Sequence, residues 1–316
     1  MIAALGSLKV TLAAFVALAA GVLAAASAES ATWPLALPLA LLAANLGAAL
    51  ACQRAFRAQL PLLVFHLALA ALVALAAAGR LTYLKGRVEL STGETFTGEL
   101  AQREAGPLHA SRLAGISFTN EGFAISYSPG LNRNETRNRV SWREGAGLHT
   151  RTIGDQHPLT LAGYRFYTSP NKGFAPLLAW RAPDGTLHRG SLHLPSYPMH
   201  DYRQAQEWTP PAASARLWLM LDFDEVLIDP QKRSEFRLPG EHALVVRAGE
   251  SRAVLKPGER IAVAGGVLAY EGLTTWMGYN VFYDWTLPWL LAAALVAVAS
   301  LGWHYWRRFS ARAWNE

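Results

Sequence analysis

Residues 60–78, LPLLVFHLALAALVALAAA, decide the fold of this chain. The stretch contains no Asp, Glu, Lys or Arg, and a helix needs about 17–25 apolar residues to cross the hydrocarbon core of a bilayer. From Arg87 onward the apolar runs become short and alternate with polar residues, which is typical of β-strands. The sequence therefore predicts a membrane-spanning helix that leads into a β-rich domain.

Three more apolar segments, at about 8–28, 33–51 and 287–303, are long enough to cross a bilayer. The composition agrees, because 52% of the residues are hydrophobic and only 16% are charged, whereas soluble domains carry about 25% charged residues. Tryptophans lie at the ends of these segments, where aromatic belts form: Trp33, Trp285, Trp289, Trp303 and Trp306. We therefore expect four transmembrane helices.

The distribution of basic residues predicts the orientation of these helices. Residues 79–284 are nearly balanced, with 23 basic and 21 acidic side chains. The other six basic residues lie in the N-terminal segment, the 52–59 loop and the C-terminal tail: Lys9, Arg54, Arg57, Arg307, Arg308 and Arg312. By the positive-inside rule both termini are cytoplasmic and residues 79–284 lie outside, while Glu29 and the loop at 29–32 add no basic residue on that side. The net charge of +6 is thus a topology signal and does not indicate a nucleic-acid partner.

The predicted fold class is membrane α+β, with a large antiparallel β-rich extracytoplasmic domain between helices three and four. Residues 1–79 would carry three helices, residues 80–284 the outer domain, and residues 285–316 the fourth helix and a basic cytoplasmic tail. Seven short strands with turn signals between them predict a sandwich or a barrel-like sheet: Ile116–Thr119, Phe123–Tyr127, Tyr164–Tyr167, Leu217–Leu221, Ala243–Val246, Ala253–Leu255 and Val267–Tyr270. The polar, Pro-rich stretch Ser196–Ala215 is expected to be a surface loop.

Two features of the first helices qualify this assignment. Ala26-Ser27-Ala28 has the pattern of a signal-peptidase site, so residues 1–28 are either the first helix or a cleaved signal peptide. Cys52 is the only cysteine, which excludes disulfides within the chain and any C-x-x-C-H haem attachment. The chain is therefore not itself a c-type cytochrome.

His66 is the sharpest candidate for function. It lies six residues, or about 9 Å, into its helix, and an ionisable side chain at that depth is costly unless it has a use. A neutral imidazole is also a common axial ligand of haem iron. Two interpretations remain open: a ligand or proton relay, or a histidine that is bonded to a neighbouring helix, for instance through Asn45.

The remaining histidines carry weaker signals. His304, at the end of the fourth helix, could pair with His66 around one iron, but their depths differ by about 10 Å, which favours an interfacial anchor. The others lie in the outer segment without metal-ligand spacing and are expected in surface or turn positions: His109, His149, His157, His188, His193, His200 and His242. No hydrolase, metalloprotease or phosphate-loop motif occurs in the chain.

Two sets of residues resemble the ResB (CcsB) family of System II cytochrome c biogenesis. The first set surrounds the third helix: Pro61-Leu62-Leu63-Val64-Phe65-His66-Leu67, Gly79, Gly86-Arg87-Val88-Glu89-Leu90 and Gly93-Glu94-Thr95-Phe96. The second set precedes the last helix: Tyr270-Glu271-Gly272-Leu273, Trp276-Met277-Gly278-Tyr279 and Tyr283-Asp284. The order of three helices, an outer β domain and a final helix is also similar, whereas residues 100–240 offer little to match.

This resemblance implies a function. Members of the family act with a CcsA/ResC-type membrane protein to carry haem b across the bacterial inner membrane and to present it for covalent attachment to the C-x-x-C-H of apocytochrome c. His66 occupies the position of the family's axial haem ligand in the third helix, and the second ligand would come from the partner. The tryptophan-rich W-W-D signature of the partner family is absent, so the chain is expected to be a non-autonomous subunit of a cytochrome c synthetase. The large domain would then be periplasmic.

Two alternatives belong to other classes of protein. The chain could be a membrane-anchored scaffold or interaction protein of the envelope that binds no haem. It could also be an electron carrier that binds haem b between His66 and His304 without any partner. Copurification of haem, with and without the partner, separates the three hypotheses.

Overall fold

The computed structural model describes residues 2–28, 31–199, 202 and 204–310. Glu29, His200, Arg312 and Glu316, which entered the sequence argument, lie outside the described residues. The chain divides into two compact units. The helical unit comprises residues 1–85, 103–111 and 282–316, and the β unit comprises residues 86–102 and 112–281.

The helical unit contains the four apolar helices that the sequence predicts, and this prediction is confirmed. All four are long and apolar enough to cross a membrane. The elements of this unit are α1 (Ile2–Leu5), α2 (Leu8–Ala28), the 3-10 turn η1 (Trp33–Leu35), α3 (Ala36–Cys52), α4 (Arg54–Arg57), α5 (Leu60–Thr82) and α6 (Leu287–Ser310). The last two helices are longer than expected, since α5 continues four residues beyond Ala78 and α6 continues to Ser310.

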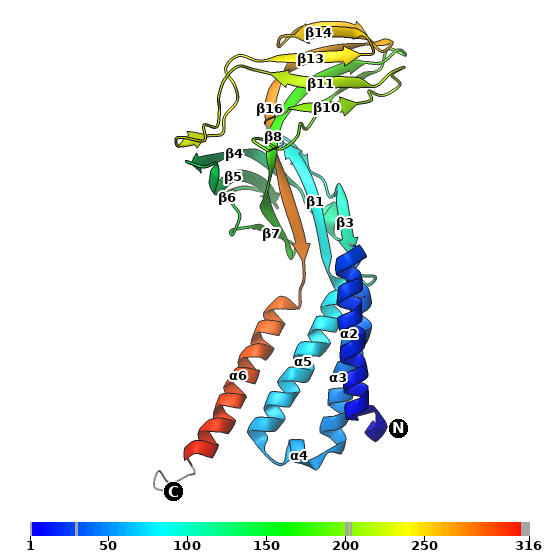
Figure 1. Cartoon of the computed structure of the whole chain (residues 1–316), viewed down its shortest axis with the longest axis vertical. Coiled ribbons are helices and arrows are strands. Elements are labelled where there is room, and N and C mark those ends of the chain that lie inside the picture. The colour runs from blue at the N-terminus through cyan, green and yellow to red at the C-terminus, as the bar shows by residue number, and fades with distance from the viewer. Residues whose placement is uncertain (1, 29–30, 200–201, 203, 311–316) are drawn as a thin grey trace. The chain divides into compact units, whose positions relative to one another are not determined.

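The helices pack in the order α2, α3, α5, α6, so that α5 lies between α3 and α6 (Figure 1). The start of α5 follows from its sequence. Gln59 is extended, and Pro61 occupies the first turn, where its missing N–H costs no helical hydrogen bond. Among the described residues of α5, only Arg80 in the last turn carries a charge.

Gly79 explains how closely α5 and the start of α6 approach each other. A Cβ at this position would lie 2.9 Å from Oγ1 of Thr286. The Asp284 carboxylate accepts hydrogen bonds from both the backbone N–H (2.9 Å) and the hydroxyl (2.6 Å) of Thr286, which fixes the turn that enters α6. A glycine is therefore needed on α5 for steric reasons.

The β unit is built from three sheets. The largest has seven strands, namely β3 (Gln102–Ala105), β1 (Leu84–Ser91), β16 (Gly266–Tyr283), β8 (Tyr164–Arg181) and β7 (Leu159–Leu161) in that order, with β15 (Arg260–Val263) on β16 and β9 (Leu187–Ser191) on β8. The second has the order β10 (Ala205–Trp208), β11 (Leu217–Asp222), β13 (Ala243–Ala248), β14 (Ser251–Leu255). The third has the order β12 (Ser234–Glu235), β4 (Phe118–Ser128), β5 (Asn132–Glu144), β6 (Gly147–Ile153), with β2 (Thr95–Phe96) on β4.

The registers of these sheets are antiparallel, as the sequence predicts. Thr119 pairs with Ser141 between β4 and β5, and Leu219 pairs with Val246 between β11 and β13. Alternate residues face inward, so β11 reads buried, half-buried and buried along its length. The buried apolar side chains of β11 and β13 form one core with Trp180 of β8 and Tyr270 of β16.

The expected surface loop at Ser196–Ala215 is largely irregular in the described residues, but it is interrupted by a short strand and a buried aromatic side chain. Strand β10 lies inside this stretch, and Tyr197 is only 3% exposed. The ring of Tyr197 packs against Phe174, with centroids 5.1 Å apart. Pro and polar residues suggested a loop because they are common in turns, but the aromatic side chain is buried all the same.

The motif Trp276–Tyr279 on β16 is part of the interior of the β unit. The Tyr279 hydroxyl donates to Oδ1 of Asn138 at 2.8 Å, and Nδ2 of Asn138 donates to Oδ1 of Asn120 at 2.8 Å. Asn120 in turn donates to the carbonyl of Leu90 at 3.0 Å. This buried chain of hydrogen bonds joins β16, β5, β4 and β1, so every polar group in it is paired.

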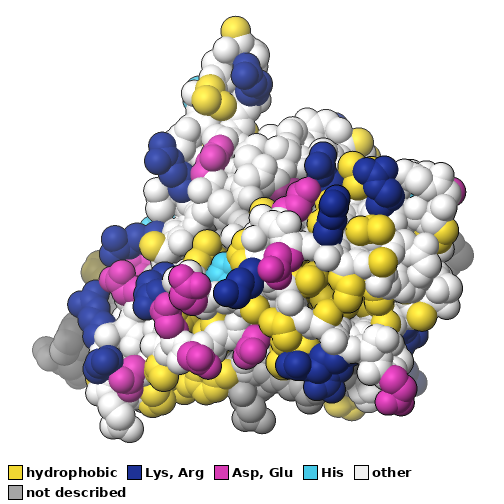
Figure 2. Space-filling model, turned by 90° about the horizontal axis from the view of Figure 1, so that it is seen from above, with side chains coloured by type: hydrophobic (Ala, Val, Ile, Leu, Met, Phe, Trp, Pro, Cys, Tyr) yellow, Lys and Arg dark blue, Asp and Glu magenta, His cyan; other side chains and the backbone are white. Residues whose placement is uncertain are grey.

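Figure 2 shows basic and acidic side chains interspersed over the face seen from above. The mixture agrees with the near balance of charge in residues 79–284. A nucleic-acid-binding surface would gather Lys and Arg into one continuous patch, and this face does not present one.

Candidate functional site

His66 lies in the second turn of α5, near the end at which the helix begins. Its side chain is half-buried. The ring packs edge-on against Phe56 of α4, with centroids 4.6 Å apart, and against Phe65 at 5.2 Å. The aromatic contacts hold the imidazole in an apolar setting at the boundary between α4 and α5.

The hydrogen bond of His66 determines which ring nitrogen carries the proton. Nδ1 lies 2.6 Å from the carbonyl oxygen of Leu62, four residues earlier on the same helix. A carbonyl can only accept, so Nδ1 must carry the hydrogen and donate it. In the neutral imidazole the lone pair is then on Nε2.

Nε2 of His66 is the free coordinating atom of this site. No hydrogen bond to it occurs among the residues that the structure describes. Metal-binding histidines usually donate their other N–H to a carbonyl or carboxylate, which fixes the tautomer and the ring. The donor chemistry of His66 therefore fits an axial ligand of haem iron.

Asn45 does not bond to His66. This buried residue of α3 donates to the carbonyls of Leu5 (2.6 Å) and Ser7 (3.1 Å) and accepts from the Thr11 hydroxyl (2.8 Å). Asn45 thus ties the break between α1 and α2 to α3, and both donors of its amide are used. The alternative interpretation of His66, a bond through Asn45, is not what the structure has.

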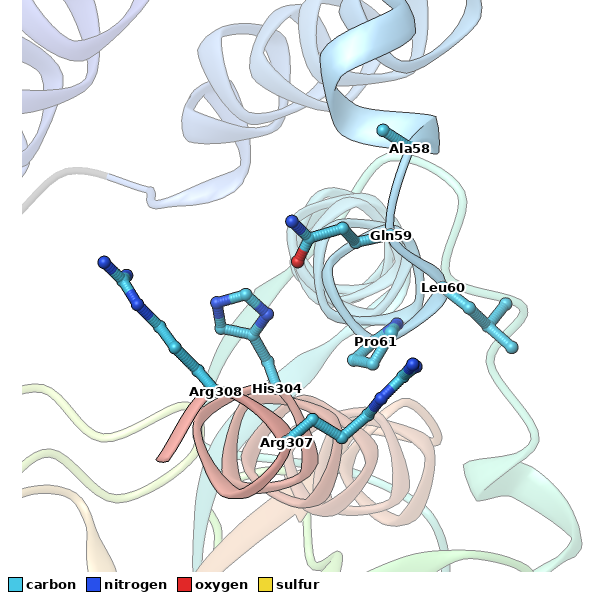
Figure 3. A pocket seen from close by; sticks show the side chains of 7 residues that line it. All are labelled: Ala58, Gln59, Leu60, Pro61, His304, Arg307 and Arg308. Carbon is cyan, nitrogen blue, oxygen red and sulfur yellow. The ribbon is translucent and has the colours of Figure 1, made fainter. Parts of the chain in front are cut away.

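His304 lies in a pocket at the same end of the helical unit (Figure 3). Its ring is edge-on to Tyr305, with centroids 5.4 Å apart. The pocket runs from Ala58–Pro61 to Arg307 and Arg308 and does not include His66. In the described part of the chain the two histidines share neither a ring contact nor a pocket.

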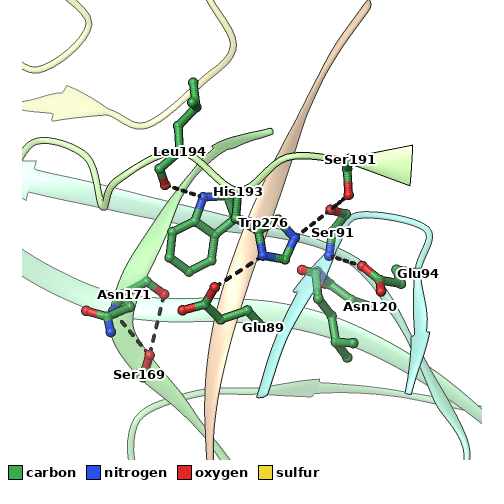
Figure 4. Close-up of polar contacts among 11 residues, drawn as sticks. Glu89, Ser91, Glu94, Asn120, Ser169, Asn171, Ser191, His193, Leu194 and Trp276 are labelled. Atoms are coloured by element: carbon green, nitrogen blue, oxygen red, sulfur yellow. Dashed lines mark hydrogen bonds and ion pairs between the residues drawn. The ribbon is translucent and has the colours of Figure 1, made fainter. Parts of the chain in front are cut away.

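A second histidine cluster lies in the β unit, around His193 (Figure 4). Its Nδ1 is 3.2 Å from Oε2 of Glu89, and its Nε2 is 3.0 Å from Oγ of Ser91. Ser91 is only 4% exposed, and its hydroxyl also bonds Oγ of Ser191 at 2.6 Å. Order and spacing resemble a serine–histidine–acid triad, but a buried hydroxyl that is already shared has no access to a substrate.

The His193 cluster instead supports the interior of the β unit. The imidazole stacks on the indole of Trp276, with centroids 5.2 Å apart and planes 16° apart. The Trp276 N–H donates to the carbonyl of Leu194 at 3.0 Å. His193 and Trp276 therefore join the segment after β9 to β16. The alternation of a strand predicts that Glu89 and Ser91 share one face of β1. Their bonds to His193 cannot be predicted from the sequence, because His193 lies far away in the chain.

A third polar cluster lies where α5 ends, in the helical unit. The Tyr83 hydroxyl donates to the Glu104 carboxylate, and the backbone N–H of Thr32 donates to the same oxygen at 3.0 Å. Burial alone would raise the pKa of Glu104, but the hydrogen bonds from Tyr83 and Thr32 outweigh burial and hold this pKa below its usual value. Burial and the bond to Glu104 raise the pKa of the Tyr83 phenol.

His109 belongs to the same end of the helical unit. Its Nδ1 lies 2.7 Å from the carbonyl of Thr82, and its ring is edge-on to Tyr283. The bonds of His109 and Glu104 attach residues 103–111 to the ends of the helices. Within the described ranges, no group of three or more His, Cys, Asp or Glu side chains could hold a metal ion.

The fold defines a multi-pass membrane protein with four candidate spans and a large antiparallel β unit. A family model described as the ResB-like family matches residues 42–314, and this chain belongs to that family. The match includes α5 with His66 and continues through the β unit into α6. The recognition made from the motifs is confirmed.

Membership in the ResB-like family, which is associated with haem handling, makes the chain a component of System II cytochrome c biogenesis. A search of curated proteins finds no match. The role of each residue has to be argued from its own geometry.

Proposed function

We propose that this chain is the haem-carrying subunit of a System II cytochrome c synthetase and that His66 supplies one axial ligand to the haem iron. The observation that carries the proposal is the free Nε2 of His66, whose tautomer is fixed by the bond from Nδ1 to Leu62. Haem is here the cargo of the protein, and iron prefers a neutral imidazole nitrogen of this kind. The apolar contacts of Phe56 and Phe65 fit a porphyrin edge better than they fit water.

The second axial ligand is expected from a partner of the CcsA/ResC type. His304 is the other histidine of this end of the helical unit, and its ring faces a pocket from which His66 is absent. A ligand from another chain removes the difference in depth that a pairing of His66 with His304 would have to bridge. Haem b would then be shared between the two proteins.

The β unit is proposed to hold apocytochrome c on the periplasmic side, to which the haem is carried from His66. Attachment requires that each thiol of C-x-x-C-H adds across one vinyl group, so that S bonds to carbon and the proton goes to the neighbouring carbon. No oxidant is consumed, and the protein must chiefly keep thiols and vinyls in register. The paired interior of the β unit, with Tyr279, Asn138 and Asn120 in one hydrogen-bonded chain, provides the rigidity that such positioning requires.

The proposed location is the bacterial inner membrane, with both termini cytoplasmic and the β unit in the periplasm. Arg54, Arg57, Arg307 and Arg308 all lie at the end of the helical unit where α5 begins and α6 ends. The positive-inside rule favours that end for the cytoplasmic side. His66 would accordingly lie in the cytoplasmic half of the membrane.

The test is coexpression with the partner protein and a reporter apocytochrome c. We expect His66→Ala to lower copurified haem and holocytochrome at least tenfold, since loss of an axial ligand removes a coordinate bond. His157→Ala, at an exposed position of the β unit, is the control and should retain both. Haem and maturation that are unchanged in His66→Ala would refute the ligand role and favour a haem-free envelope scaffold.

A further inference from the structure

The pocket around His304 has a chemistry of its own. It is a hollow of about 410 Å³ between the beginning of α5 and the end of α6. In Figure 3 the side chains of Gln59, His304 and Arg308 lie around one space, and Arg307 extends along the other side toward Pro61. The groups in the lining that can donate hydrogen bonds are thus two guanidiniums, an amide and an imidazole.

Among the described residues, no carboxylate forms an ion pair with the arginines of this pocket. Residues 2–28, 31–82 and 287–310 contain no Asp or Glu. Neither Arg307 nor Arg308 takes part in any ion pair among the described residues, and all six such pairs lie in the β unit. Arg307 and Arg308 both line the hollow, so an anion there would be attracted by two positive charges.

The start of α5 adds to the positive potential. The helix has 23 residues, and no side chain caps its first N–H groups. Pro61 has no N–H, and the N–H of Leu63 already donates to the carbonyl of Gln59. The positive end of the helix dipole lies at this start of α5, which lines the pocket together with the two arginines. The helix dipole adds to the positive potential of the two guanidiniums, which attract an anion even without it.

Exposed apolar side chains lie on the helix ends that form the pocket. Leu60 in its lining is 56% exposed, and Trp303, Trp306 and Phe309 on the last turns of α6 are at least 44% exposed. Aromatic side chains of this kind at a helix end mark the membrane–water boundary. A ligand here therefore meets cationic donors at one end and hydrocarbon at the other.

From these observations we infer that the pocket of Gln59, His304, Arg307 and Arg308 binds the acidic head of an anionic amphiphile. The head is a phosphate or a carboxylate, because both accept paired hydrogen bonds from guanidinium groups. Two sources share this chemistry, namely an anionic phospholipid and the propionates of haem. The inference does not depend on ligation of iron by His66.

The experiment uses the full chain in nanodiscs. Arg307→Gln/Arg308→Gln removes the pocket cations, and Arg54→Gln/Arg57→Gln removes the same charge from α4, which does not line the pocket. Retained lipid is measured by native mass spectrometry in mixtures of phosphatidylglycerol and phosphatidylcholine. Binding of ferric haem is compared with binding of its dimethyl ester in discs of phosphatidylcholine alone.

If the lipid is the source, the pocket variant loses its preference for phosphatidylglycerol about tenfold, as expected for two charge-assisted contacts, while the α4 variant keeps it. If haem is the source, the wild type prefers the free acid over the ester and only the pocket variant loses that preference. Equal effects in both variants, or no effect in either, would overturn the inference, because the charges would then act only as topology signals.

A second variant guards against failure to fold. Arg307→Lys/Arg308→Lys keeps the charge and loses the planar fork, so it should keep part of the preference and the topology of the chain. His66→Ala, measured in parallel, should leave the pocket preference unchanged. Failure of the pocket and failure of the haem-ligand proposal therefore give different results.

Discussion

At the scale of single residues, the hydrogen bond of His66 fixes which ring nitrogen carries the proton. Nδ1 of His66 donates to Leu62, and this bond lies within one turn of α5. A bond of that kind contributes only about 1 kcal/mol to stability. The ring also packs against Phe56 of α4, and we propose the ligand role in addition to this packing because Nε2 keeps its lone pair.

Lys172 is a buried cation of the β unit. It is 3% exposed on β8, donates to the carbonyl of Pro170 at 3.1 Å, and lies 5.5 Å from the ring centroid of Tyr127. Burial, with a further contribution from the positive charge of Arg133, lowers the pKa of its amine to about 8. The unfolded chain, with the ordinary pKa of 10.5, binds this proton more tightly than the folded chain does.

The linkage predicts a rise in stability with pH. Between about pH 8 and 10 the unfolded state holds more protons at Lys172, so the free energy of unfolding should increase across this window by a few kcal/mol. Thermal unfolding of the full chain in detergent at pH 7, 8, 9 and 10 measures it. Lys172→Met should be more stable at pH 7 and should remove this part of the slope. Identical slopes for wild type and variant would contradict the assignment.

At the scale of elements, the approach of α5 to the start of α6 rests on Gly79. An added Cβ would meet Oγ1 of Thr286 at 2.9 Å, which real Cβ contacts do not tolerate. Gly79 lies in the last turn of α5, which ends at Thr82, and β1 begins at Leu84. The contact between α5 and the start of α6 therefore lies close to the point where α5 leads into β1.

Gly79→Leu is expected to destabilise the helical unit by about 1–3 kcal/mol, the range found when a close-packed site is overfilled. Gly47→Leu on α3 is the matched control, because a Cβ there meets nothing within 4 Å. Thermal stability in detergent and resistance to protease report the difference. Equal losses in the two variants would show that the close contact with Thr286 is not the cause.

The sequence predicts the elements unequally. The helices are evident because long apolar runs need no knowledge of their neighbours. The two longest strands, β8 and β16, have 18 residues each, but the sequence suggests only their short segments at Tyr164–Tyr167 and Val267–Tyr270. Pro170 and Gly272 lie inside these strands, and such residues weaken a strand pattern in a sequence, although both strands continue past them.

The residues of the candidate sites also differ in how visible they are in the sequence. His66 is visible in the sequence because one ionisable residue interrupts an apolar helix. The pocket of Gln59 and Arg308 and the pairing of Glu89 with His193 join residues that are more than 100 positions apart. No local pattern carries such a pairing, so only the folded chain reveals it.

At the scale of the whole molecule, the orientation in the membrane is open to a direct test. Cys52 is the only cysteine of the chain and is exposed at the end of α3. If this end is cytoplasmic, a membrane-impermeant maleimide should label Cys52 only after spheroplasts are lysed. Glu144→Cys in a Cys52→Ser background, at an exposed position of β5, should be labelled in intact spheroplasts. The opposite pattern would invert the proposed topology.

The account also predicts that this chain and its partner complete the haem site together. Among the described residues, His66 and His304 share no pocket, so we expect the second ligand from the partner. Iron bound by the chain alone should therefore lack one strong axial ligand, and the complex should supply it. A carrier that used His66 and His304 would have both ligands without the partner.

The most direct measurement is the absorption spectrum of the chain, purified with and without its partner, as wild type and as His66→Gly. The account predicts a low-spin Soret band for the wild-type complex, its loss in the complex with His66→Gly, and its return when free imidazole is added to fill the space left by the side chain. A low-spin spectrum that persists in the His66→Gly complex without imidazole would contradict the claim that His66 binds the iron.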